Sequence, residues 1–89
     1  MRLKDRVAII TGAGRGIGRA IALAYAREGA IMTLAARSGD ELEETARMAQ
    51  GLGATTHIVP TDITKQADVD EMVRQTVDRF STVDILVNN

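Results

Sequence analysis

Four short apolar segments alternate along this chain with three segments whose apolar residues recur at helical spacing. The apolar segments cover residues 7–10, 31–36, 55–59 and 84–87, and the helical patterns cover residues 16–28, 38–50 and 69–80. The apolar segments are nearly continuous, which is typical of parallel strands that helices cover on both faces. The order β-α-β-α-β-α-β therefore predicts an α/β fold, in which helices flank one parallel sheet with right-handed crossovers.

Boundary signals and packing faces support the three predicted helices. The first helix is expected to stop at Gly29 and to pack through Ile17, Ala20, Ile21, Ala24 and Tyr25. Ser38 and Glu41 open the second helix as a capping box, in which the hydroxyl accepts from a free amide while the carboxylate reaches back. The third helix has the clearest apolar face, formed by Val69, Met72, Val73, Thr76, Val77 and Phe80.

Composition excludes several classes of function. With 89 residues the chain forms at most one small domain, residues 1–89. It has no cysteine and a single histidine, so we expect no disulfide, no thiolate chemistry and no metal site. The net charge of −1 and the scattered arginines give no basic surface for nucleic acid or an anionic membrane. The first apolar segment is too short for a signal or a membrane span, so we expect a cytoplasmic protein.

A glycine-rich segment, residues 11–18, joins the first predicted strand to the first predicted helix. The first turn of a helix presents unbonded amides and a partial positive charge, so it attracts phosphate groups. Glycines let the backbone turn sharply and approach a phosphate without a Cβ in the way. A tight turn that binds nothing is the alternative, but such a turn needs fewer glycines than this segment contains.

The glycine spacing differs from that of two common phosphate-binding loops. The G-x-G-x-x-G fingerprint fails, because the sixth position is Ile17 counted from Gly12 and Arg19 counted from Gly14. A Walker A loop is excluded because no Lys-Ser or Lys-Thr pair follows the glycines. The spacing is instead T-G-x-x-x-G-x-G, beginning at Thr11.

This spacing after an N-terminal strand resembles the short-chain dehydrogenase/reductase family, and two further motifs agree. Residues 62–64 (DIT) stand where that family has a D-[VIL]-T segment, and residues 84–89 (DILVNN) resemble its D-x-L-V-N-N-A-G stretch. The motifs follow the family's order on the expected elements, so the resemblance covers essentially the whole chain. We expect a Rossmann-like sheet with strand order 3-2-1-4. Because the last motif stops after its second asparagine, we expect a fragment truncated after the fourth strand.

The end of the second strand predicts which dinucleotide binds. A NAD site places an Asp or Glu there to accept from the ribose 2′-hydroxyl. This chain has Ala36 followed by Arg37, whose guanidinium matches a 2′-phosphate. The resemblance implies that Arg15, inside the glycine loop, reaches the same phosphate. We therefore expect NADP(H) rather than NAD(H), and we include Ser38, beside Arg37, in the candidate site.

The resemblance carries further roles onto matching positions. The backbone around Ile17 would hold the pyrophosphate, together with Gly12, Ala13, Gly14, Gly16 and Gly18. Asp62 and the amide of Ile63 would read the adenine edge, although a helix-entry cap beside Thr64 is a common alternative use of such an aspartate. Asn88 and Asn89 would contact the adenosine ribose and tie strands together.

The resemblance also implies hydride transfer between nicotinamide and a small carbonyl or alcohol substrate, in a parent expected to be a homo-oligomer. The family uses a serine and a Tyr-x-x-x-Lys pair for this chemistry. Here the only tyrosine, Tyr25, has Gly29 four positions later, and neither Ser38 nor Ser81 follows the fourth strand. We therefore assign no catalytic residue within the chain.

Two other classes of function are alternatives to an oxidoreductase. A non-catalytic half-domain would bind nucleotide without turnover, which we expect of the isolated chain but not of its parent. A methyltransferase that uses S-adenosylmethionine could share the sheet, but its cofactor has no phosphate for Arg15 and Arg37 to bind.

Overall fold

The computed structural model describes residues 2–89 and confirms the expected order of elements and strands. The elements are β1 (Val7–Thr11), α1 (Gly16–Arg27), β2 (Ile31–Ala36), α2 (Gly39–Gly51), β3 (Thr55–Pro60), α3 (Gln66–Phe80) and β4 (Ile85–Val87). The strands form one parallel sheet in the order β3-β2-β1-β4. β1 is flanked by β2 on one side and by β4 on the other. The direction in which strands are added to the sheet therefore reverses beside β1.

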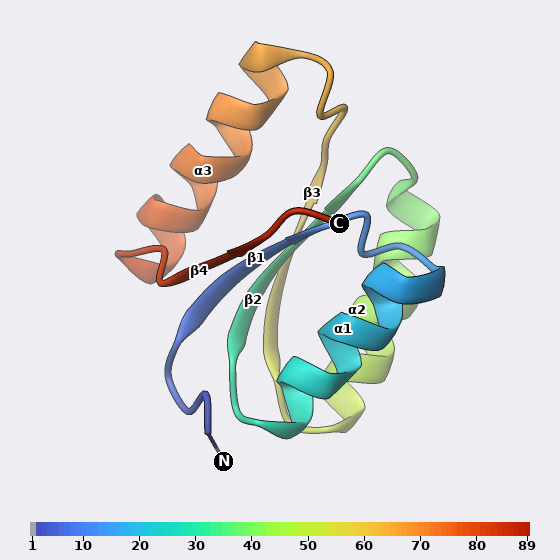
Figure 1. The fold of residues 1–89 in the computed structure, drawn as a ribbon, viewed down its shortest axis with the longest axis vertical. Coiled ribbons are helices and arrows are strands. Elements are labelled where there is room, and N and C mark those ends of the chain that lie inside the picture. Colours follow the sequence, from blue (N-terminus) through green and yellow to red (C-terminus); the bar gives the residue numbers. More distant parts are fainter. Residues whose placement is uncertain (1) are drawn as a thin grey trace.

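The sheet is a middle layer, with α1 and α2 on one face and α3 on the other (Figure 1). Side chains of β1 alternate between the two faces. Ala8 and Ile10 pack in the core under α1 and α2, whereas Ile9 packs with Met72 of α3. Both sets are buried, so β1 is apolar at consecutive positions as its sequence predicted.

The two edge strands are less buried than their sequences indicated. The residues of β1 are all buried and those of β2 nearly so, but β3 is exposed at both ends and Leu86 of β4 is 61% exposed. The expectation that all four strands are covered on both faces is therefore wrong for β3 and β4. Each of these strands pairs on one side only within residues 2–89.

Helix α1 packs through a different stripe from the one predicted. Its buried residues are Gly18, Ala22 and Ala26, whereas Ile17 is 73% exposed. Ala20 and Ala24, also expected in the core, are exposed; Ile21 and Tyr25 are half-buried against it. Small residues on the buried stripe let the helix backbone approach the sheet closely, which larger side chains would prevent.

Helix α3 buries only part of its predicted face. Met72 and Thr76 are buried, and the Thr76 hydroxyl lies 2.7 Å from that of Thr33 on β2. Val73 and Val77 are exposed, which corrects their assignment to the core. Within residues 2–89 α3 is the sole helix on its face of the sheet, so only the side chains that point directly at the sheet are covered.

Candidate functional site

A cleft of about 280 Å³ opens where the loops after the four strands meet. Its walls are formed by Gly12, Gly14, Arg15, Ala36, Arg37, Ser38, Glu41, Thr61, Ile63 and Asn89. It therefore lies at the carboxyl ends of the strands, beside the point where the strand order reverses. This is the position at which open α/β sheets bind their ligands.

The backbone around Gly12 leaves no room for side chains. Gly12 has φ +62°, and a Cβ there would lie 2.7 Å from Nδ2 of Asn89. A Cβ on Gly18 would lie 1.8 Å from the carbonyl oxygen of Gly12. These two glycines are therefore required by the loop itself, because α1 begins in direct contact with the end of β1.

Thr11 connects the glycine loop to the end of β4. Its buried hydroxyl lies 3.3 Å from both the carbonyl oxygen of Val87 and Oδ1 of Asn88, and it accepts from the backbone amide of Asn89 at 3.0 Å. The T-G and N-N motifs, at opposite ends of the sequence, are thus joined by hydrogen bonds. The Asn88 and Asn89 contacts give both residues a role in tying strands together.

The helices that begin near the cleft have very different first turns. The N-cap of α1 is Arg15, which makes no side-chain capping bond, and the first turn has no acidic residue. The N-cap of α2 is Ser38, whose hydroxyl accepts from the amide of Glu41, and its first turn contains Asp40 and Glu41. An anion is therefore accommodated better by α1 than by α2.

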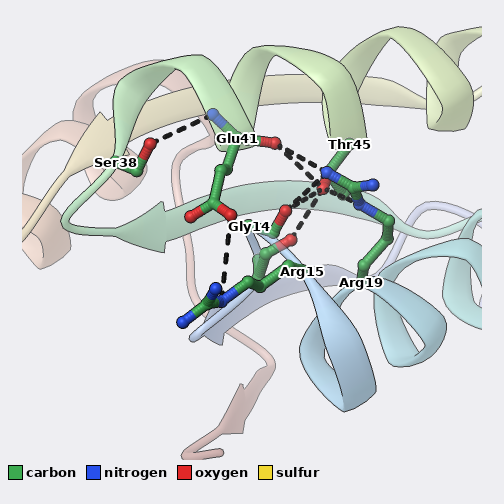
Figure 2. A network of polar contacts seen from close by, with 7 residues as sticks. Gly14, Arg15, Arg19, Ser38, Glu41 and Thr45 are labelled. Carbon is green, nitrogen blue, oxygen red and sulfur yellow. Dashed lines mark hydrogen bonds and ion pairs between the residues drawn. The ribbon is translucent and has the colours of Figure 1, made fainter.

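A buried polar clamp fixes the glycine loop against α2 (Figure 2). The hydroxyl of Thr45 lies 2.8 Å from the carbonyl oxygen of Ala13 and accepts from Nε of Arg19 at 2.9 Å. Nη2 of Arg19 also donates to the carbonyl oxygen of Gly14 at 2.6 Å. Arg19 and Thr45 are not predictable as site residues from the sequence, because a contact between residues 26 positions apart leaves no local signal.

Both arginines expected at the cleft stand beside a carboxylate. Nε of Arg15 lies 3.8 Å from Glu41, and Nη2 of Arg37 lies 3.5 Å from Asp62. Thr64 donates two hydrogen bonds to Asp62, from its hydroxyl at 2.6 Å and its amide at 2.9 Å. These bonds are the main reason that the pKa of Asp62 is lowered, with a smaller contribution from the charge of Arg37. The carboxylate thus makes a turn with Thr64. It does not form the helix-entry cap expected as its alternative use, because the N-cap of α3 is Lys65, which has no side-chain capping bond.

The cleft brings together many, but not all, of the candidate site residues. Gly12, Gly14, Arg15, Arg37, Ser38, Ile63 and Asn89 line it. Ala13 is buried beneath the loop, Gly18 is buried against β1, and Gly16 and Ile17 are exposed on the first turn of α1. Asp62 and Asn88 are beside the cleft rather than in its wall. Glu41 and Thr61 also line the wall, although no sequence motif indicates either as a site residue.

The donor set of the cleft fits a phosphorylated nucleotide. No carboxylate follows β2 directly, since Ala36 ends that strand and Arg37 follows it. Two guanidinium groups and the uncapped first turn of α1 supply donors for negatively charged oxygens. In residues 2–89 there is no cluster of three or more metal-ligating side chains, and no helix is both long and apolar enough to cross a membrane.

Comparisons with known proteins agree on one family. A family model described as short chain dehydrogenase matches residues 6–89. The short-chain dehydrogenase/reductase homolog YusS of Bacillus subtilis (strain 168) is 40% identical over 90 residues, which cover 100% of this chain and 83% of YusS.

Solved structures share the fold closely. Glucose dehydrogenase of Caenorhabditis elegans, in its apo form, superposes with a TM-score of 0.94 at 42% identity, covering 100% of this chain and 39% of that one. A NAD+-bound xylitol dehydrogenase superposes with a TM-score of 0.96 at 30% identity, covering 100% of this chain and 34% of that one. The chain also spans 34–37% of the length of other curated relatives that it matches.

Proposed function

The chain belongs to the short-chain dehydrogenase family, and we propose from this premise that its cleft binds the adenosine-pyrophosphate half of NADP(H). Members of this family are oxidoreductases that use NAD(P). The observation that carries the proposal is the composition of the cleft, where Arg15 and Arg37 face a space that no carboxylate of β2 enters.

The pyrophosphate would lie over the first turn of α1. This turn has neither a side-chain cap nor an acidic residue, so its amides are available to an anion. The close contact between Gly18 and Gly12 holds the first turn of α1 against the end of β1, beside the cleft. The amides around Ile17 would donate to the phosphate oxygens.

The 2′-phosphate would lie between the two arginines. Arg37 follows β2 directly, and Arg15 stands on the loop opposite, so both can reach one group in the cleft. The ion pairs that they make here are long, and the guanidinium group of each is largely exposed, so these pairs contribute little. A phosphate can therefore replace the carboxylates as the partner of both guanidinium groups.

The remaining contacts would position the adenosine. Ile63 is 52% exposed on the wall of the cleft, where an adenine ring could cover it. Asp62 and the Ile63 amide would read the adenine edge, and Asn89 and Asn88 would lie near the ribose. Ser38 would border the 2′-phosphate while it caps α2.

The parent enzyme would transfer hydride between nicotinamide and a carbonyl or alcohol carbon of a small molecule. Within these 89 residues no Tyr-x-x-x-Lys pair occurs, and Tyr25 lies half-buried on α1 against the core. We therefore expect the purified chain to bind NADPH without oxidising it. Carbonyl-dependent NADPH oxidation by the pure chain would contradict this expectation.

Calorimetric titration of the chain with NADPH and NADH tests the proposal. We expect NADPH to bind on the order of tenfold more tightly or better, since a hydrogen bond to a charged group contributes about 1.5–3 kcal/mol. The double variant Ala36→Asp, Arg37→Ile should reverse the preference. Arg27→Ile, which removes an exposed arginine at the far end of α1, should leave it unchanged. Equal affinities of the unmodified chain for the two cofactors would overturn the NADP assignment.

A further inference from the structure

We infer that Glu41 competes with the 2′-phosphate of the ligand for Arg15, and thereby limits the preference of the cleft for 2′-phosphorylated nucleotides. This inference rests on the proposed function of the cleft. Glu41, whose sequence context indicates only a helix cap, then has a specificity-determining role.

The backbone of Glu41 is held rigidly beside the glycine loop (Figure 2). Its amide donates to the hydroxyl of Ser38 at 3.3 Å. Its carbonyl oxygen lies 3.2 Å from the hydroxyl of Thr45 and accepts from Arg19 at 3.3 Å. The Cβ of Glu41 would be only 3.0 Å from a Cβ placed on Gly14. The side chain therefore starts at a fixed point on the wall of the cleft.

The carboxylate of Glu41 points across the cleft toward Arg15 (Figure 2). Nε of Arg15 is 3.8 Å away, and the two side chains are 83% and 40% exposed for Arg15 and Glu41 respectively. Within residues 2–89 the Glu41 carboxylate has Arg15 as its only ion-pair partner. In the same residues that carboxylate accepts no hydrogen bond. Such an exposed, long pair is weak enough for a ligand to displace.

Each guanidinium group that faces the cleft stands beside one carboxylate. Arg15 and Arg37 bring two positive charges, whereas Glu41 and Asp62 bring two negative ones. A 2′-phosphate therefore meets carboxylates as well as guanidinium groups at the cleft. At physiological salt the screening length is about 8 Å, so a carboxylate within a few ångströms of the phosphate still repels it.

Glu41 is a better competitor than Asp62. The Asp62 carboxylate accepts two hydrogen bonds from Thr64, so its charge keeps these partners when Arg37 turns to a phosphate. The Glu41 carboxylate loses its single partner when Arg15 turns to a phosphate. Its negative charge then remains unpaired on the wall of the same cleft.

The test compares 2′,5′-ADP with 5′-AMP, which differ by the 2′-phosphate. Both are titrated calorimetrically into the unmodified chain, Glu41→Gln and Asp40→Asn. Asp40 is the matched control, because it is exposed in the same first turn of α2 but lies outside the cleft wall. We expect Glu41→Gln to tighten binding of 2′,5′-ADP by about 2- to 5-fold, corresponding to the upper range of exposed charge interactions.

We expect Glu41→Gln to change 5′-AMP binding little, and Asp40→Asn to change neither ligand appreciably. In an Arg15→Gln background the gain from Glu41→Gln should shrink to the part that direct repulsion contributes, since the competition needs Arg15. Circular dichroism of each variant verifies that the fold is retained.

Two results overturn the inference while leaving the proposed function intact. One is unchanged 2′,5′-ADP binding by Glu41→Gln in a chain that binds both nucleotides. The other is selective loss of 5′-AMP binding, which would make Glu41 an acceptor for an unphosphorylated ribose. If no folded variant binds either nucleotide, the proposed nucleotide site itself is wrong and the inference falls with it.

Discussion

Gly18 approaches Gly12 so closely that a Cβ on Gly18 would lie 1.8 Å from the carbonyl oxygen of Gly12. The obstructing atom belongs to the backbone, so no side-chain rearrangement relieves the clash. The contact joins the first turn of α1 to the end of β1, and it thereby sets the position of the helix terminus beside the cleft.

Replacing Gly18→Ala should therefore destabilise the chain severely. We expect a loss of more than about 3 kcal/mol in the free energy of unfolding, at or beyond the usual range for overpacking. Gly51→Ala is the matched control, because no atom lies within 4 Å of its Cβ position at the end of α2. The control should gain roughly 0.5–1 kcal/mol from helix propensity. Urea denaturation followed by circular dichroism measures both, and similar stabilities for the two variants would contradict the clash.

The clamp between Thr45 and Arg19 should be a second determinant of stability. Thr45→Val keeps the side-chain shape but removes the hydroxyl that Arg19 and Ala13 contact. We expect a loss of about 1–3 kcal/mol, the usual result of leaving buried polar groups unpaired. Thr55→Val, at an exposed position of β3, is the control and should be nearly neutral. If the two valine variants unfold at the same urea concentration, the clamp does not stabilise the loop.

The outer edge of β4 should make the isolated chain associate. β4 pairs only with β1 within the described residues, and its central residue Leu86 is largely exposed and uncharged. We expect dimers or larger species in sedimentation velocity, and expect Leu86→Lys to restore the monomer at the same concentration. Val87→Lys is a less clean probe, because Val87 packs against the core under α1.

Val73→Lys provides the control for that experiment. Val73 is also exposed, but it lies on α3 rather than on the strand edge. If Val73→Lys converts the associated chain to a monomer and Leu86→Lys does not, association proceeds through α3. A chain that sediments as a monomer before any substitution contradicts the prediction outright.

Strand positions were predictable from the sequence because they follow from continuous apolar runs and ordered motifs. The small difference at β4 has a cause in a contact between the two ends of the chain. Asp84 was expected in the strand, but its carboxylate and amide both bond the backbone of Val7, and the ladder begins one residue later. The pairing order also followed from the sequence, since crossover handedness and the family resemblance leave few arrangements.

The packing faces of the helices were less predictable. In α1, alanines occupy several stripes, so periodicity alone could not distinguish the buried Ala22 from the exposed Ala24. The approach of Gly18 to Gly12 determines which stripe is buried, and helical periodicity gives no sign of that contact. The role of Glu41 was hidden for a related reason, because its capping position is local but its contact with Arg15 depends on how α2 meets the loop.

The most direct measurement of the central claim is a titration of ¹⁵N-labelled chain with NADPH, followed by amide chemical shifts. We expect saturable shifts at the amides of residues 12–18 and 36–38, which form the glycine loop and the end of β2. Residues 51–54, at the opposite end of the sheet, should remain unchanged. An absence of saturable shifts, or shifts confined to that opposite end, would contradict the assignment of the cleft as the site of the adenosine-pyrophosphate half of NADP(H).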